Sequence, residues 1–199
     1  MLGLPSTTEV SQRIPKEAFY RNMDLDARTR EQFVSGVDRI VVRNAIRPDT
    51  ANIASGERVR EILVVEVTPK AGEVPEAVAQ TVLRANPNPM VVTDGSTGRV
   101  WARSTGRTVT SDGLATLSLA GPTMDEAWDS ILAQVAFREE DGRDVGARLE
   151  RREAIELLER EVETLDRRCR RERQIARRNE LFVQLRRKQA ELAALKEEA

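Results

Sequence analysis

Hydrophobic positions follow one rhythm up to about residue 137 and another after it. The first part contains short β-branched runs, and the clearest is EILVVEV, whose nearly continuous apolar run is typical of a strand covered on both faces. Strands are therefore predicted at residues 61–67 and 39–43, at 90–93 and 99–103 as a hairpin, and at 114–119 as a further hairpin partner.

Helical patterns alternate with these strands. Pro15 and Pro75 stand where helices begin, and Asp26 is a suitable N-cap for another helix. The sequence TMDE at 123–126 has the form of a capping box in front of a last amphipathic helix. This order predicts an α/β fold, a mixed sheet with flanking helices, over residues 1–137.

The C-terminal part has the seven-residue repeat of a coiled coil. After a polar linker at 138–146, residues 147–199 lack glycine and proline. One apolar seam comprises Ile155, Leu158, Val162, Leu165 and Cys169, and a second comprises Leu181, Leu185, Lys188, Leu192 and Leu195. The two seams are out of phase, which favours a helical coiled-coil hairpin bent near residues 173–177. The alternative is one continuous helix in a dimeric coil, which would make the protein a homo-oligomer.

The amino-acid composition excludes several classes of catalytic and metal-binding site. The chain has no histidine and one cysteine, which excludes histidine-based nucleophiles, histidine zinc sites and an internal disulfide. We therefore expect no resident cofactor. The opening MLGLPSTTEV lacks the features of a signal peptide, and no apolar run reaches the roughly 20 residues that cross a bilayer, so a cytoplasmic protein without membrane contact is expected.

Charge is distributed unevenly around a formal net of −1. Residues 147–199 carry 15 basic and 12 acidic residues, whereas residues 1–146 carry 17 and 21. The basic excess gathers in one cluster, comprising Arg167, Arg168, Arg170, Arg171, Arg173, Arg177 and Arg178. Such arginines bind phosphates or an acidic protein surface, or pair with acids four residues away on a solvated helix. No aromatic residue is interleaved, so base stacking is not expected and a protein target is favoured over the DNA backbone.

A second candidate site resembles the PD-(D/E)XK nucleases. Asp49 follows a proline, and Glu66 and Lys70 lie near the end of the strongest predicted strand. In this chemistry two carboxylates hold Mg²⁺ while the lysine orients the attacking water. Thr68 stands where the second acid belongs, so the motif is incomplete. The alternative interpretation makes Asp49 a turn residue and Glu66 a charge on the strand.

Three stretches of the sequence resemble an uncharacterised bacterial family. They are LPSTTEVSQRIPKEAFY, RPDTANI followed by EILVVEV, and ERQIARRNELFVQL. The family consists of small α/β proteins with a charged C-terminal coil, encoded near DNA helicases and methyltransferases in restriction-like or anti-phage loci. This resemblance implies an accessory role in DNA defence.

The leading hypothesis is therefore a non-catalytic adaptor. The α/β domain and the basic coil would hold a larger DNA-processing protein, such as a helicase or methyltransferase. Two alternatives stay open: a Mg²⁺-dependent nuclease using Asp49, Glu66 and Lys70, and a protein that only self-assembles through its coil.

Overall fold

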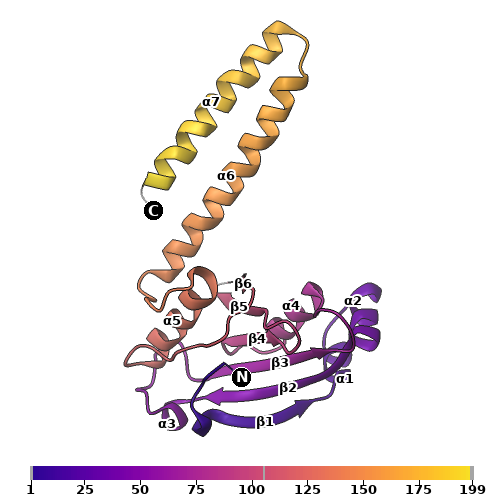
Figure 1. Ribbon diagram of the computed structural model, residues 1–199, viewed down its shortest axis with the longest axis vertical. Helices are drawn as coiled ribbons and strands as arrows, with labels where there is room; N and C mark the ends of the chain where they lie inside the picture. Colours follow the sequence, from indigo (N-terminus) through magenta and orange to yellow (C-terminus); the bar gives the residue numbers. More distant parts are fainter. Residues whose placement is uncertain (1, 105, 198–199) are drawn as a thin grey trace. The chain divides into compact units, whose positions relative to one another are not determined.

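The computed structural model describes residues 2–104 and 106–197. The chain divides into two compact units, Met1–Val145 and Gly146–Ala199 (Figure 1). The first unit is an α/β domain and the second is a pair of long helices.

A mixed six-stranded sheet forms the centre of the first unit. Its strands are β1 (Glu9–Ile14), β2 (Val37–Ile46), β3 (Ile62–Pro69), β4 (Met90–Asp94), β5 (Val100–Ser104) and β6 (Arg107–Ser111). They lie in chain order across the sheet, and every neighbouring pair is antiparallel except β3 and β4. The predicted α/β class with a mixed sheet and flanking helices is confirmed.

Helices and the main core cover one face of this sheet (Figure 1). Residues of α1 (Glu17–Asn22), the π-helical turn η2 (Gln32–Gly36) and α4 (Glu76–Arg84) contribute to this core. Helix α2 (Ala27–Glu31) leads directly into η2. The rings of Phe19 and Phe33 stack with centroids 5.3 Å apart, in one cluster with Val65 and Val67 of β3. Trp101 is fully buried in the same cluster, and its indole Nε1 donates to Glu76 Oε2 at 2.7 Å. The buried indole N–H of Trp101 thus has a hydrogen-bond partner within an otherwise apolar core.

Helix α5 (Met124–Phe137) packs against β5 and β6. The predicted capping box is present, because Thr123 Oγ1 accepts from the Glu126 N–H and Glu126 accepts from the Thr123 N–H. Asp125 in the first turn accepts backbone N–H bonds from residues 57–59. Burial would raise the pKa of Asp125, but those backbone donors and Arg58 together lower it. The loop in front of β3 is thus tied to the start of α5.

Short helical turns complete the unit: η1 (Ser6–Thr8) precedes β1, and α3 (Pro48–Ala51) follows β2. The helix predicted from Asp26 does begin there, with Asp26 Oδ1 accepting from the Thr29 N–H at 2.8 Å.

The prediction of a strand at residues 114–119 is wrong. The second partner of β5, beside β4, is β6, which follows β5 in the chain, and residues 114–120 form no strand. The side chain of Gln134 instead bonds both the N–H and the carbonyl of Ser118, which satisfies the backbone where a strand would have paired. Strand β1 was not predicted at all.

The second unit is a helical hairpin. Helix α6 (Val145–Arg171) and helix α7 (Ile175–Glu197) are joined by three residues, so the predicted hairpin is confirmed and a continuous helix is excluded. Helix α6 begins inside the segment expected to be a linker, at Val145. Leu158, Cys169 and Leu185 are buried, and other seam residues are half-buried.

Ion pairs link the two helices of the hairpin. Lys188 Nζ lies 3.0 Å from Glu161 Oε2, and Lys196 Nζ lies 2.7 Å from Glu159 Oε1. The hydrogen bonds that Lys188 donates to Glu161 and Glu191 raise the pKa of Lys188. Residues later in α7 thus pair with residues earlier in α6, as antiparallel helices require.

Candidate functional site

The three residues of the nuclease hypothesis do not form one site. Ile46 at the end of β2 pairs with Ile62 at the start of β3, and Asp49 lies just beyond that end. Glu66 is four residues beyond Ile62 on β3, which puts it about 13 Å from Ile62 along the strand at roughly 3.3 Å per residue. Lys70 lies past the other end of the strand, where its Nζ donates to the carbonyl of Val34 at 2.9 Å. The hairpin therefore places Asp49 and Lys70 at opposite ends of β3.

The individual contacts of these residues are structural as well. Asp49 Oδ1 accepts from the adjacent Thr50 N–H at 3.0 Å, and Thr68 Oγ1 accepts from Arg39 Nε at 3.3 Å. Within residues 2–104 and 106–197, no group of three or more acidic or cysteine side chains is arranged to hold a metal ion. The arrangement thus does not fit Mg²⁺ bound between Asp49 and Glu66.

Glu66 instead belongs to an ion pair on the sheet face opposite the main core. Arg43 Nη2 on β2 lies 2.6 Å from Glu66 Oε1 on β3, with side chains 36% and 22% exposed. The hydrogen bond that Arg43 donates to Glu66 raises the pKa of Arg43. Gly95 packs closely against Glu66, since a Cβ there would lie 3.3 Å from Glu66 Cγ. A carboxylate engaged in this way is poorly placed to bind a divalent cation.

This ion pair lies in a cavity of about 390 Å³. Its polar lining residues are Glu9, Ser11, Arg43, Asn44, Glu66, Thr93 and Asp94. The carboxylate of Asp94 is already fully used, because it accepts from the backbone of Val74 at 2.7 Å and from Ser96 at 2.6 and 2.7 Å. Burial would raise the pKa of Asp94, but these hydrogen bonds lower it. Asp94 therefore organises the turn after β4.

The wall of the cavity contains one unusual backbone position. Ser11 has a φ of +49° at the point where the pairing of β1 with β2 shifts register. This left-handed conformation is unfavourable for a non-glycine residue. Sequence reasoning did not find this cavity. Its only sequence signal was a pair of opposite charges within two largely apolar strands.

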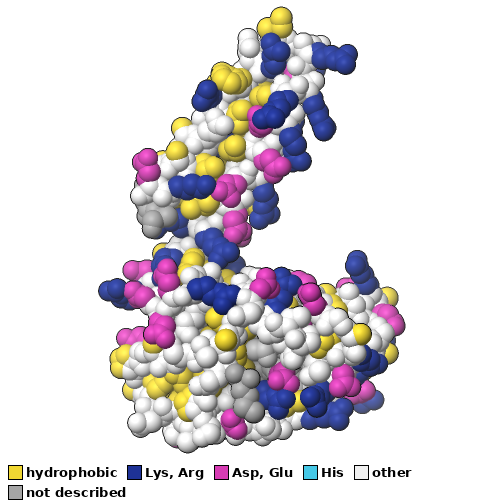
Figure 2. Space-filling model, viewed as in Figure 1, with side chains coloured by type: hydrophobic (Ala, Val, Ile, Leu, Met, Phe, Trp, Pro, Cys, Tyr) yellow, Lys and Arg dark blue, Asp and Glu magenta, His cyan; other side chains and the backbone are white. Residues whose placement is uncertain are grey.

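The arginine cluster lies around the bend of the hairpin. Helix α6 ends at Arg171 and α7 starts at Ile175, so the structure brings together the arginines at both helix ends (Figure 2). All seven are exposed: Arg167, Arg168, Arg170, Arg171, Arg173, Arg177 and Arg178. We refer to these seven residues as the arginine-rich bend.

Few of these arginines have an acidic partner within the chain. Arg170 pairs with Asp166 at 2.8 Å and Arg167 with Glu163 at 3.9 Å, both four residues earlier on α6. The other five make no ion pair with any residue in the part of the chain that the structure describes. Pairing along the helix thus accounts for two of the seven arginines and leaves the rest open to a partner.

Two arginines oppose the electrostatics of their own helix. Arg177 and Arg178 lie at the start of α7, whose first turn contains no acidic residue. A helix N-terminus carries partial positive charge, so cations there are destabilising by a few tenths of a kcal/mol each. An anionic group bound from outside would relieve this repulsion.

Nearly the whole chain matches the profile of a protein family. The sequence profile described as Domain of unknown function (DUF4391) covers residues 2–192. This chain belongs to the DUF4391 family. No curated protein and no solved structure matches it.

Membership in DUF4391 confirms the resemblance to an uncharacterised family and leaves its link to DNA defence a prediction. No helix of this DUF4391 protein, within the residues that the structure describes, is both long and apolar enough to cross a membrane. The arginine-rich bend is the candidate functional site that the geometry favours.

Proposed function

We propose that this protein is a non-catalytic adaptor that holds a larger DNA-processing protein, such as a helicase or methyltransferase, in a bacterial DNA-defence complex. The arginine-rich bend is the main contact and the α/β domain supplies a further one. The observation that carries the proposal is the group of five exposed arginines around one helical bend without an ion pair in the described chain.

The partner surface is acidic protein in this proposal. Arginines bind carboxylates with paired N–H groups, and the repulsion at the start of α7 diminishes when carboxylates approach it. The absence of aromatic residues among the seven arginines disfavours single-stranded nucleic acid. Contact with a phosphate backbone is a separate outcome that the test below distinguishes.

The hairpin provides a suitable support for such a contact. We propose that α6 and α7 pack as an antiparallel coiled coil, which is supported by the burial of Leu158, Cys169 and Leu185 at heptad positions. The ion pairs of Lys188 and Lys196 add cross-links along the same two helices. A stiff pair of helices holds the arginines in a fixed arrangement, which lowers the entropy lost on binding.

Purification from the cells that encode the protein tests the proposal. The tagged full chain is compared with Arg171→Glu/Arg173→Glu/Arg177→Glu and with a control of equal charge change, Arg13→Glu/Arg21→Glu/Arg60→Glu, at exposed positions of the α/β unit. We expect a helicase or methyltransferase to co-purify in near-stoichiometric amount with the wild type and the control and to be lost from the first variant. A wild-type protein that holds no partner, or equal losses in both variants, would contradict the proposal.

A duplex DNA-binding assay accompanies this purification. Binding that falls steeply with salt and is lost only in the bend variant would identify the phosphate backbone as the target. Partner capture without such binding is the expected result.

A further inference from the structure

Helix α7 has apolar residues on two separate faces. Its seam faces α6 and contains Leu181, Leu185, Leu192 and Leu195, which are buried or half-buried. A second apolar stripe comprises Ile175, Phe182 and Val183, which we call the outer stripe. At about 100° per residue, the centres of the two faces are about 130° apart around the helix axis. One helix partner, α6, covers only the seam.

The outer stripe is strongly exposed. Ile175 is 69% exposed, Phe182 49% and Val183 68%. The described chain exposes six large hydrophobic residues to this degree, and half of them lie in these nine positions of one helix. Such clustering at helical spacing marks an interaction face, because isolated exposed apolar residues would be scattered. The stripe spans about two and a half turns, which suits a partner helix packed alongside.

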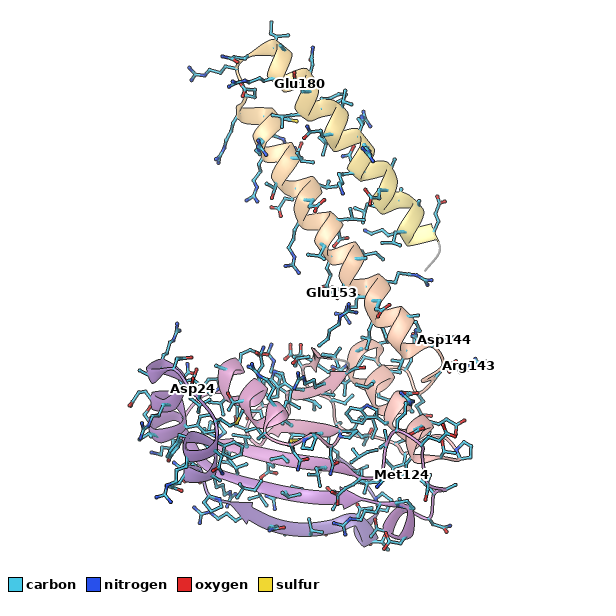
Figure 3. The ribbon with its side chains drawn as sticks, turned by 180° about the vertical axis from the view of Figure 1, so that it is seen from behind. Asp24, Met124, Arg143, Asp144, Glu153 and Glu180 are labelled. Atoms are coloured by element: carbon cyan, nitrogen blue, oxygen red, sulfur yellow. The ribbon has the colours of Figure 1, made fainter. Side chains whose placement is uncertain are left out.

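Basic residues surround the outer stripe. Arg186 lies over the ring of Phe182, with its guanidinium carbon 5.2 Å from the ring centroid. Arg178 and Arg187 flank the stripe, and Glu180, labelled in Figure 3, is the one acidic residue between Ile175 and Arg187 in the sequence. The complement of this surface is apolar along its centre and negatively charged at its edges.

A second copy of this chain does not have that chemistry. Pairing two outer stripes in either direction would bring the arginines of both copies into one interface, where like charges repel. The occupant therefore has to bring its own carboxylates.

We propose that the outer stripe of α7 is a docking site for an acidic amphipathic helix of a partner protein. The proposal rests on the adaptor function and specifies the kind of surface that the partner presents. Apolar residues of the partner at helical spacing cover Phe182 and Val183, and its flanking Glu or Asp side chains pair with Arg178 and Arg187.

A synthetic peptide is the probe for this site. It has about four heptads, with leucine at positions a and d and glutamate at e and g, so that it is amphipathic and acidic. Its matched control carries lysine at e and g. Fluorescence anisotropy measures the binding of each labelled peptide to the full-length chain.

We expect the acidic peptide to bind, with an affinity that falls as salt is raised, and the lysine peptide not to bind. Val183→Asp and Phe182→Ser should each weaken binding about tenfold or more. Leu157→Asp changes a residue on α6 that is 50% exposed, and it should leave binding unchanged. Far-UV circular dichroism checks that all three variants keep their helix content.

Three results would overturn the proposal: no binding of the acidic peptide, equal binding by the two stripe variants and the wild type, or a wild-type dimer in light scattering that Val183→Asp converts to a monomer. The last result would make a second copy the occupant. Co-purification that is lost in the bend variant while both stripe variants retain the partner would refute the stripe alone. Peptide binding in a protein that holds no cellular partner would refute the adaptor function alone.

Discussion

Arg43 donates from Nη2 to Oε1 of Glu66 at 2.6 Å, across the strands β2 and β3. The bond joins two charges on a sheet face that is only partly open to water. The nuclease hypothesis makes Glu66 a metal ligand, whereas in the structure Glu66 is the ion-pair partner of Arg43.

Breaking this pair should destabilise the α/β unit. Arg43→Met leaves Glu66 without its partner, and Glu66→Gln removes the charge that Arg43 faces. Each should lower the free energy of unfolding by about 1 kcal/mol, since both side chains retain some contact with water. Urea denaturation followed by the fluorescence of Trp101 and Trp128 measures this. The double variant should lose less than the sum of the two, and strictly additive losses would show that the pair contributes no coupling.

Asp94 should make part of the stability depend on pH. Its pKa is lowered from 3.8, although burial acts to raise it, because Ser96, Val74 and Thr97 donate hydrogen bonds. The contribution of Asp94 to stability is therefore complete above pH 3.8, the ordinary pKa that it has in the unfolded chain. It is lost as the pH falls from there through the lower pKa that Asp94 has in the folded protein. Asp94→Asn should cost about 2 kcal/mol at neutral pH. The difference from the wild type should shrink in acid, and a difference that stays constant down to pH 2 would contradict this account.

Lys70 provides the sharpest test of the nuclease alternative. Its ammonium group bonds the carbonyl of Val34, and Asp49 lies at the other end of β3. We therefore expect the pure protein to show no Mg²⁺-dependent cleavage of duplex or single-stranded DNA on an agarose gel, with Lys70→Ala indistinguishable from it. Cleavage by the wild type that disappears in Lys70→Ala would restore the nuclease hypothesis.

Sequence patterns predicted the elements that have a strong local signal. The apolar run of β3 and the capping box at Thr123 both report local energetics, namely burial on two faces and satisfied helix N–H groups. Strand β1 gave no such signal, because five of its six residues are exposed and the sixth is half-buried. An edge strand of this kind forms through its pairing with β2, which no local pattern encodes.

The candidate sites also differ in whether a local sequence pattern predicts them. The arginine-rich bend was predicted from the sequence because a loss of heptad phase and a charge cluster coincide within twelve residues. The separation of Asp49 from Glu66 depends on the register of β2 with β3, in which Ile46 faces Ile62. The outer stripe of α7 was missed because a heptad search examines one face of a helix, and Phe182 and Val183 lie on another.

Cys169 reports directly on the packing of the hairpin. It is the only cysteine of the chain, and it is 9% exposed on the seam of α6. A buried thiol reacts with a thiol reagent only when the surrounding structure opens. Leu185 on α7 is 5% exposed, and Leu185→Ala should destabilise the packed hairpin by about 2 kcal/mol, at the low end for such substitutions because many neighbouring side chains are half-buried. Labelling of Cys169 should then become faster by roughly tenfold or more, as a change of 1.4 kcal/mol in the opening equilibrium is a factor of ten.

Val183→Ala on the outer stripe is the matched control and should leave the labelling rate unchanged, since that side chain is 68% exposed. Equal acceleration by both variants would show that the packing of Leu185 on the seam is not what protects the thiol. No acceleration by Leu185→Ala would show that Leu185 does not hold the hairpin closed.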